Sequence, residues 1–485
     1  MAAIVVAGCA ITIAYGERIG INDGQGWDGM TYAQWAIDFW KSVVVDGVTR
    51  YGAQRVLPSA IVHYGLVAAG YAPTARQVIT GFQLLDAALL AGAALLWAHL
   101  GGVMRWSRGA RWVGFVALFG GFANARHALY YPTLTDPMAF FLGMAMVWAY
   151  LANRPIALWL VIAAGIVTWP ALPPLAAALL VFPRAEVAPL AEGSKLARWR
   201  VPGARAIAGA VVAGFLGYAW YYLEHPSQGL GDEKLAAWVR RDLLVLTVPG
   251  LVALLGLGAY VVVAQPRLWN VRGYLRALAL RRTALALAGI AALIVLRAWW
   301  LGAIGTQGDG PSGAQFGCEL TLAALRGPLW GLVHHVVYFG PIVLVAAIAW
   351  PAVARTASAW GPIACVGLGM IVVFAAGSNS RQWIHLLPLL VALAIAATHD
   401  RWTPRRALAF AAIALAWSKL WLHIGYDRIV SFWEFPNQRY FMNTGPYASD
   451  TMYLVHLIAA AVTAALVFAL LRVSSPSAPR SDRPG

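Results

Sequence analysis

The sequence is poor in charged residues and in cysteine. Only 12% of its 485 residues are charged, 60% are hydrophobic, and the mean hydropathy is +0.66. So little charge cannot cover the surface of a water-soluble protein of this length, and a chain that crosses a membrane many times is indicated. The three cysteines, Cys9, Cys318 and Cys365, are far apart and odd in number. They support neither a disulfide framework nor a cysteine metal site.

Several catalytic signatures are also missing. No HExxH or CxxC motif occurs, and the polar connections contain no Asp-x-Asp cluster, so the ligand spacing of common metal sites is absent. No glycine-rich loop precedes a Lys-Ser or Lys-Thr pair, which argues against nucleotide hydrolysis. We leave the cofactor open: a divalent cation bridged by Asp28 and Asp136 is compatible with the preference of hard cations for carboxylates.

Long apolar runs make up most of the chain and predict an all-α, polytopic transmembrane protein with about 13 spans. A break at Trp169-Pro170 makes two of these runs either a tight hairpin or one kinked pair, which gives 13 or 14 crossings. The predicted spans lie near residues 1–15, 78–99, 112–127, 134–152, 155–170, 171–183, 206–223, 243–264, 283–303, 328–350, 360–376, 382–398, 407–424 and 453–471.

Basic residues exceed acidic ones by 16, and their distribution decides what that excess means. With the first connection outside, the inner connections hold 21 of the 36 lysines and arginines but only four of the 20 acids. This is the positive-inside pattern, so we expect the charge to anchor the chain to membrane lipids and expect no nucleic-acid partner. The inner connections are residues 100–111, 153–155, 183–205, 265–282, 351–360, 398–406 and the tail from residue 472.

The most polar early stretch runs from Trp27 to Pro58 and cannot lie in hydrocarbon. Its apolar residues recur at helical spacing between Tyr32 and Val44, which predicts an interfacial helix with its aromatic face down. A glycine-rich turn before this helix presents Asp28. Ser59 to Ala72 is bracketed by prolines and is short, so we expect a shallow or re-entrant helix there.

These features predict one transmembrane domain over residues 1–472, with residues 16–77 forming an external loop that carries interfacial helices. The tail, residues 473–485, is rich in proline and serine. We expect it to be disordered and cytoplasmic.

Ionisable groups at the outer ends of spans are the candidate site residues, because charge at that depth is costly and commonly functional. Arg126 and His127 end one run and Asp136 opens the next, although Asp136 can also be a helix N-cap before Pro137. Arg381 and His385 are four positions apart at the start of a later run, and on an α-helix they would share a face. An arginine in that place can also simply reach toward the interface.

The order of these features resembles the GT-C superfamily of polytopic glycosyltransferases. The likeness rests on WDGMTY (27–32), YPTLTDP (131–137) and SRQWIHLLP (380–388), and the block TRYGAQRVLPS (49–59) also resembles uncharacterised bacterial membrane proteins near that superfamily. Members use a sugar carried on a polyprenyl phosphate and work on the outer face of the membrane. One departure is that Asp28 lacks the adjacent second acid common in the superfamily.

The resemblance implies a role for each candidate. Asp28 is the expected base for the acceptor hydroxyl, and Arg381, with Arg55 or Arg126, is expected to neutralise the departing phosphate. Asp136 is expected to orient an acceptor hydroxyl or a metal ion.

His127, His385 and Tyr32 complete the expected substrate-binding set. Trp27, Tyr32 and the Tyr130-Tyr131 pair offer aromatic surface for a sugar ring, although interfacial belts enrich the same residue types.

The implied reaction transfers a sugar from the polyprenyl-phosphate carrier to a glycan, lipid or protein acceptor. The implied location is the bacterial inner membrane, with the active site facing the periplasm or exterior. Two alternatives stay open: a transporter or flippase of a lipid-linked or polar solute, and an O-antigen polymerase or ligase built on the loop from Ile424 to Tyr453.

Overall fold

A computed structural model describes residues 1–182, 280–304, 328–422 and 450–472, together with the single residues 184, 202, 206, 213, 273 and 424. Within these residues the chain is all-helical and contains no strand. The expected α class is therefore confirmed for the described part. Apart from the single residues 206 and 213, the predicted spans at 206–223 and 243–264 lie outside the described residues, as do the tail 473–485 and most of the loop from Ile424 to Tyr453.

The N-terminal part forms a helix of 14 residues, a turn and then further helices of several kinds. The turn around residues 22–26 uses left-handed backbone at Asn22, Asp23, Gly24 and Gly26, which glycine and Asn or Asp tolerate best. The elements are α1 (Ala2–Tyr15), η1 (Ile21–Gly24), α2 (Asp28–Ile37), η2 (Trp40–Val45), η3 (Gly52–Gln54) and α3 (Leu57–Ala68).

The helix predicted between Tyr32 and Val44 is present in two pieces, because Asp38 leaves the helical conformation between α2 and η2. Its aromatic face is buried at Tyr32, Trp35 and Phe39, whereas Trp40 is 63% exposed. The Ser59 hydroxyl on α3 donates to the Tyr32 carbonyl oxygen at 2.9 Å, so α3 packs directly against this face.

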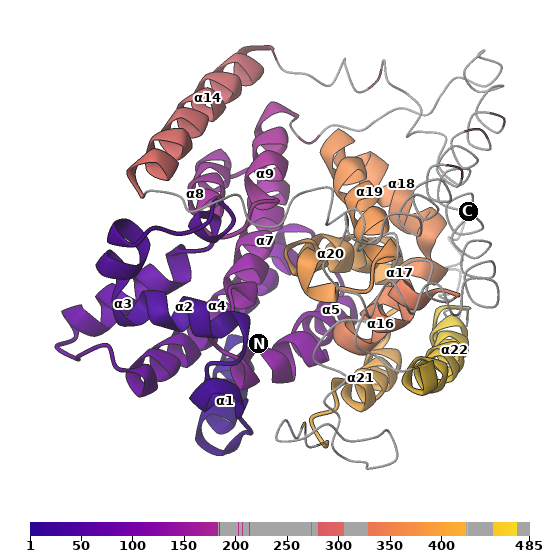
Figure 1. The fold of residues 1–485 in the computed structure, drawn as a ribbon. Helices are drawn as coiled ribbons and strands as arrows, with labels where there is room; N and C mark the ends of the chain where they lie inside the picture. The colour runs from indigo at the N-terminus through magenta and orange to yellow at the C-terminus, as the bar shows by residue number, and fades with distance from the viewer. Residues whose placement is uncertain are drawn as a thin grey trace, which may run out of the picture.

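The middle of the chain supplies the central layer (Figure 1). Helix α7 lies between the N-terminal helices and the later helices α16 to α20, and α14 lies at one edge of the molecule. The elements are α4 (Ala75–Val103), α5 (Arg108–Phe119), η4 (Ala123–His127), α6 (Ala128–Tyr130), α7 (Asp136–Leu151), α8 (Pro155–Ile166), α9 (Leu172–Val181) and α14 (Leu280–Ala303).

Helices α8 and α9 pack against each other on either side of the Trp169-Pro170 break, which makes this pair a hairpin. Proline in the first turn begins both helices, since its fixed φ suits that position and its missing N–H is not needed there.

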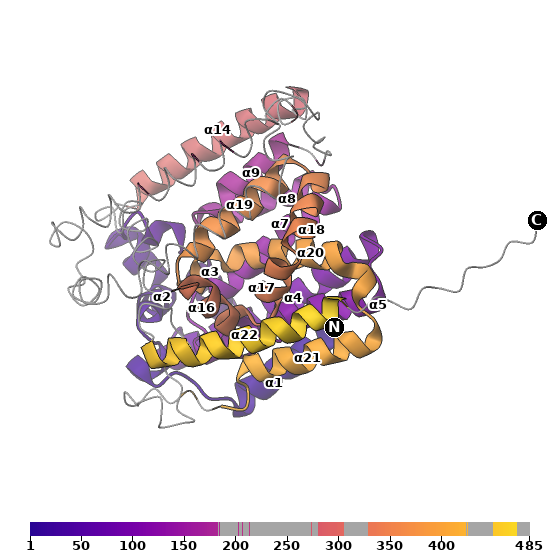
Figure 2. The same cartoon turned by 90° about the vertical axis from the view of Figure 1, so that its right-hand side faces the viewer.

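The C-terminal part packs around α20, whose residues Leu387 to Ile395 are all buried. Figure 2 shows α21 and α22 running side by side along the edge opposite α14. The elements are α16 (Trp330–Phe339), α17 (Ile342–Ile348), α18 (Trp350–Trp360), α19 (Pro362–Ala376), η8 (Ser380–Leu386), α20 (Leu387–Thr398), η9 (His399–Arg401), α21 (Pro404–Ser418) and α22 (Asp450–Arg472).

Four helical segments among the described residues are long and apolar enough to cross a membrane. They are residues Ala75–Val103, Thr283–Ala303, Ser380–Arg401 and Met452–Arg472, and the pair α17–α18, bent by 88°, raises the number to five if it is one span. Six further apolar helices are only 10–17 residues long. A multi-pass membrane protein is consistent with this set, while the count of about 13 crossings stays a prediction.

Candidate functional site

Arg381 and Asp136 form an ion pair at the centre of the candidate site. Arg381 Nε donates to Asp136 Oδ1 at 2.9 Å and its Nη2 donates to Oδ2 at 3.1 Å, so the planar guanidinium engages both carboxylate oxygens. The side chains are 18% and 3% exposed. Helix α7 starts at Asp136 itself and its N-cap is Thr135, so the carboxylate serves Arg381 instead of capping the helix.

Arg55 reaches the same place from the segment before α3. Its Nη1 donates to the Thr135 hydroxyl at 3.0 Å, one residue from Asp136, with which it interacts electrostatically. The guanidinium lies 4.4 Å from the ring centre of Tyr51 and 4.3 Å from that of Trp169. Stacking on the two aromatic rings fixes the guanidinium of Arg55, a second positive charge, in a position that faces the Arg381–Asp136 ion pair.

His127 and Tyr338 close the inner side of the site. Both line one narrow gap together with Tyr131 and Asp136. The Tyr338 hydroxyl and His127 Nδ1 are hydrogen-bonded at 3.0 Å, and His127 Nε2 is buried without a partner. Tyr338 was not among the residues predicted from the sequence, because it lies within an apolar run that resembles a plain membrane span.

Asp28 is positioned by close packing of the glycine turn on the segment before α7. The Gly29 amide donates to Tyr131 Oη at 2.9 Å, and the Thr133 hydroxyl donates to the Gln25 carbonyl at 2.9 Å. A Cβ atom on Gly29 would overlap Thr133 Oγ1, and one on Gly26 would overlap the Tyr131 ring. Only glycine therefore allows the start of α2 to lie this close to the segment.

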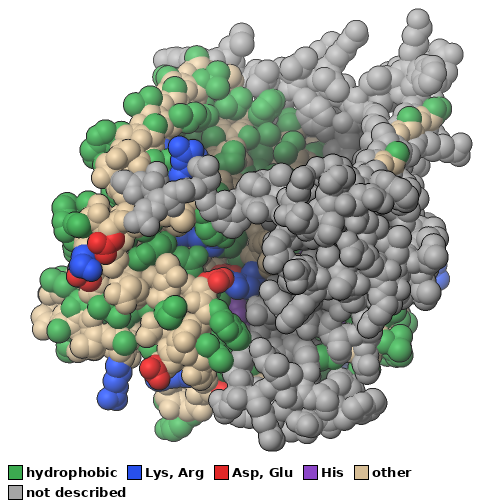
Figure 3. Space-filling model, in the orientation of Figure 1, with side chains coloured by type: hydrophobic (Ala, Val, Ile, Leu, Met, Phe, Trp, Pro, Cys, Tyr) green, Lys and Arg blue, Asp and Glu red, His purple; other side chains and the backbone are tan. Residues whose placement is uncertain are grey.

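The carboxylate of Asp28 is exposed, and it acts electrostatically on Arg381 and on Tyr131. Asp28 and Arg381 thus share one electrostatic environment. Figure 3 shows an acidic, a basic and a histidine side chain next to one another in a hollow of the surface.

Two tyrosines beside Asp28 keep their protons at neutral pH. Burial raises the pKa of Tyr32 to about 12, against the opposing effect of Arg55. Burial likewise raises the pKa of Tyr131 to about 12, although the hydrogen bond from Gly29 works the other way. Neither phenol is suited to act as a base at neutral pH.

Two of the predicted site residues, Arg126 and His385, make contacts other than with the Arg381–Asp136 pair. Arg126 Nη2 lies 2.6 Å from Glu17 Oε2 and donates to the Leu422 carbonyl at 3.2 Å, so its charge is already paired. His385 is fully buried beside Trp169 and Phe374, and neither ring nitrogen has a hydrogen-bond partner. Residues 380–386 form a 3-10 helix with a kink at Trp383, so Arg381 and His385 do not share a face as they would on an α-helix.

The described residues contain no cluster of three or more histidine, cysteine or acidic side chains suited to a metal ion. Both oxygens of Asp136 accept hydrogen bonds from Arg381. A cation bridging Asp28 and Asp136 would therefore share the Asp136 carboxylate with that arginine.

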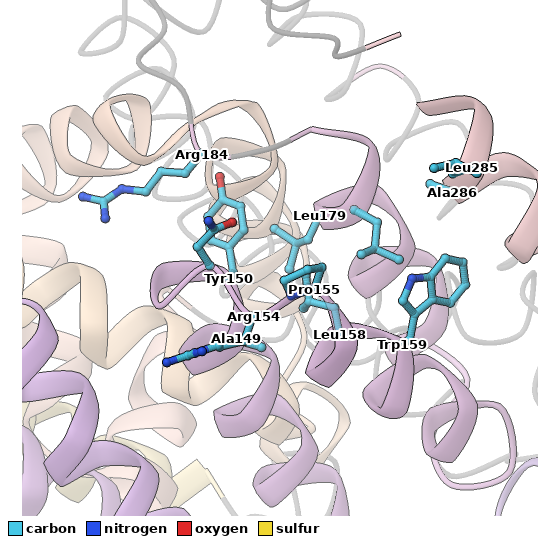
Figure 4. A pocket seen from close by; sticks show the side chains of 12 residues that line it. Ala149, Tyr150, Arg154, Pro155, Leu158, Trp159, Leu179, Arg184, Leu285 and Ala286 are labelled. Carbon is cyan, nitrogen blue, oxygen red and sulfur yellow. The ribbon is translucent and has the colours of Figure 1, made fainter. Parts of the chain in front are cut away.

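A cavity of about 250 Å³ lies away from this site, between α7, α8, α9 and α14. Figure 4 shows Leu179, Leu158, Trp159 and Pro155 on its walls, with Tyr150 at one end. None of the predicted site residues lines it.

No family model, no curated protein and no solved structure matches this chain.

Proposed function

We propose that the chain is a membrane glycosyltransferase that moves a sugar from a polyprenyl-phosphate carrier to an acceptor on the outer face of a bacterial inner membrane. The observation that supports this best is the exposed Asp28 carboxylate within electrostatic range of Arg381, which is held in place by Asp136. A base and a fixed cation in one environment are what transfer from a phosphate leaving group requires.

The reaction assigns one role to each group. The acceptor hydroxyl loses its proton to Asp28 while its oxygen forms a bond to the anomeric carbon of the sugar. The bond between that carbon and the phosphate oxygen breaks, and the polyprenyl phosphate leaves with the electron pair. Arg381 and Arg55 neutralise the charge that develops on the phosphate.

Asp136 is a positioning residue in this mechanism. Its two hydrogen bonds hold the guanidinium of Arg381 in one orientation before the donor arrives, and this lowers the cost of ordering the site. The role first expected for Asp136, orienting an acceptor hydroxyl or a metal, is not used in this mechanism, in which its oxygens hold Arg381. Arg126 is given no part in the mechanism, because its described contacts are with Glu17 and the Leu422 carbonyl and not with Asp28, Asp136 or Arg381.

The experiment uses membranes that contain the full chain and a panel of radiolabelled polyprenyl-phosphate hexoses and pentoses. Asp28→Asn should abolish transfer of label while leaving the melting temperature within about 2 °C of wild type, as for most surface substitutions. The matched control is Asp23→Asn, an exposed acid in the same turn whose left-handed backbone also suits asparagine. Full transfer by Asp28→Asn would remove Asp28 from the mechanism.

One observation favours a transporter as the second candidate. Asp86 is 2% exposed in the middle of α4, a helix long enough to cross a membrane, and it acts electrostatically on Asp136. Buried carboxylates at that depth are common in proton and ion pathways. Proteoliposomes separate the two: substrate-driven translocation without transfer of label supports the transporter, and transfer without translocation supports the glycosyltransferase. The loop needed for an O-antigen polymerase or ligase lies largely outside the described residues.

A further inference from the structure

The cavity between α7, α8, α9 and α14 has two ends of different character. Two arginines, Arg154 and Arg184, line it together with Tyr150, and most of its other lining residues are apolar. Figure 4 shows both arginine side chains extending to one side of Tyr150, whereas Trp159 and Leu285 lie on the other side. The cavity thus presents a cationic end and a hydrocarbon end to one ligand.

The cationic end is accessible, and its charge is not neutralised by the residues that the structure describes. Arg154 and Arg184 are both exposed, and neither forms an ion pair with a described residue. No acidic side chain is among the described residues that line the cavity. Arg184 acts electrostatically on Tyr150, whose hydroxyl already donates to the Trp360 carbonyl at 2.6 Å. Two free guanidinium groups select an anion, and their planar donor fork suits a phosphate.

The hydrocarbon end is formed by three helices and opens toward lipid. Leu158 of α8 and Leu179 of α9 are buried walls, whereas Leu285 of α14 is 66% exposed. Helix α14 packs closely on α8, since a Cβ atom on Gly289 would overlap the Trp159 ring. The remaining surface of α14 is apolar and almost wholly exposed, as for a helix surrounded by lipid. An acyl chain from the bilayer therefore has direct access to the cavity.

The ends of the surrounding helices place the arginines at one level. Arg154 directly precedes α8 and Arg184 follows α9, so both lie at the open end of this hairpin, where α7 also ends. Residues 153–155 and 183–205 belong to connections that the charge distribution predicts on the inner side of the membrane. Anionic headgroups are found at that surface, and basic pockets between helices bind them there.

We infer that this cavity binds one anionic phospholipid, with the phosphate between Arg154 and Arg184 and an acyl chain along Leu158, Leu179 and Leu285. A free phosphate leaves the apolar walls without a partner, and a zwitterionic lipid brings a second cation to the arginines. The volume, about 250 Å³, is below that of sites for whole drug-sized molecules, about 300–1,000 Å³. It holds the part of the lipid next to the headgroup, and the rest of the chain lies along α14 in the bilayer.

The test measures lipid binding to the purified full chain in detergent by native mass spectrometry. The probes are dioleoyl phosphatidylglycerol, which is anionic, and dioleoyl phosphatidylcholine, which has the same chains and no net charge. The first molecule of phosphatidylglycerol should bind at least tenfold more tightly than phosphatidylcholine. Equal binding would overturn the selection by charge. Displacement of the lipid by the same concentration of glycerol 1-phosphate would show that a free phosphate is the ligand and would overturn the lipid site.

A pair of arginine variants tests whether the cavity or the general surface charge attracts the lipid. Arg154→Gln with Arg184→Gln should weaken binding of phosphatidylglycerol at least tenfold. The matched control is Arg105→Gln with Arg108→Gln, two exposed arginines of another connection expected inside, which do not line the cavity. It removes the same charge and should leave binding unchanged. Equal weakening by the two double variants would overturn the site.

Ala286 offers a variant that fills the hydrocarbon end. It lines the cavity from α14 and is 3% exposed. Ala286→Phe should weaken binding of phosphatidylglycerol at least tenfold, and Ala286→Leu carries the same test if thermal melting shows that the larger variant does not fold. The control is Ala288→Phe, at an exposed position of the same helix that does not line the cavity. Unchanged binding by a folded Ala286 variant would overturn the location.

The lipid site does not rest on the proposed function, and the same assay separates the two. Asp28→Asn should bind phosphatidylglycerol with wild-type affinity, because Asp28 does not line the cavity. Selective binding in the wild type with no sugar transfer from any donor would contradict the transferase and support the lipid site. Sugar transfer without selective binding of phosphatidylglycerol would contradict the lipid site alone.

Discussion

The backbone amide of Gly29 donates a 2.9 Å hydrogen bond to the phenolic oxygen of Tyr131. These residues are 102 positions apart, and their contact joins the turn that carries Asp28 to the segment that leads into Asp136. The relative placement of the two carboxylates thus depends on one close backbone approach.

Replacing Gly29 tests this dependence. A Cβ atom in Gly29→Ala would overlap Thr133 Oγ1 and press on the Tyr131 ring, so we expect a loss of about 1–3 kcal/mol of stability and a loss of transfer activity. Thermal melting in detergent and the transfer assay measure both effects. Gly65→Ala, in open space on a helix, should be neutral or slightly stabilising. A Gly29→Ala protein as stable and active as wild type would contradict the packing described.

The Arg381–Asp136 pair makes a second prediction, about stability. Asp136→Asn leaves a largely buried guanidinium unpaired, and the expected cost is about 3–5 kcal/mol. Replacing both residues by leucine should cost less than the Asp136→Asn change alone, because no uncompensated charge remains. The exposed pair of Lys41 and Asp46 is the control, and Asp46→Asn should cost less than about 1 kcal/mol. Equal costs for the two asparagine variants would contradict the burial of the central pair.

The polar residues at span ends were predictable because charge in an apolar chain is conspicuous. Asp136 and Arg381 were selected on that ground, whereas Asp28 came from the polar stretch between Trp27 and Pro58, and Arg55 from the resemblance to the GT-C superfamily. The structure brings the four into one electrostatic environment. The helical class followed from the same composition.

Other features depend on partners that local sequence does not reveal. Glu17 pairs with Arg126 over 109 positions, and Tyr338 reaches His127 from within an apolar run. Residues 380–386 form a 3-10 helix, so spacing rules for an α-helix misplace His385. The number of crossings is equally hard to obtain, because short apolar helices resemble pieces of spans.

Arg55 provides a third prediction, about the donor phosphate. Lysine keeps the charge but lacks the planar group that stacks on Tyr51 and Trp169 and bonds Thr135. Arg55→Lys should therefore raise the KM for the polyprenyl-phosphate donor at least tenfold with a smaller change in kcat. Arg76→Lys, at an exposed position in the first turn of α4, should leave both constants unchanged. An unchanged donor KM in Arg55→Lys would remove Arg55 from phosphate binding.

The buried tyrosines predict how stability changes in alkali. The pKa of Tyr131 is raised from 10 to about 12 in the folded chain. The contribution of Tyr131 to folding stability is therefore fully present below pH 10 and is lost as the pH rises toward 12. One such group gives a slope of up to about 1.4 kcal/mol per pH unit in that interval. Melting temperatures between pH 9 and 11 measure the decline.

Tyr131→Phe should flatten the decline, because phenylalanine has no proton to lose. The exposed Tyr71 is the control, and Tyr71→Phe should keep the wild-type slope. Burial also raises the pKa of Tyr32 to about 12, so Tyr32 should contribute a second, separable part of this decline. The double variant Tyr32→Phe/Tyr131→Phe should therefore show a flatter decline of melting temperature with pH than either single variant. A wild-type slope in the double variant would mean that other groups control the alkaline transition and that these phenols are not buried as described.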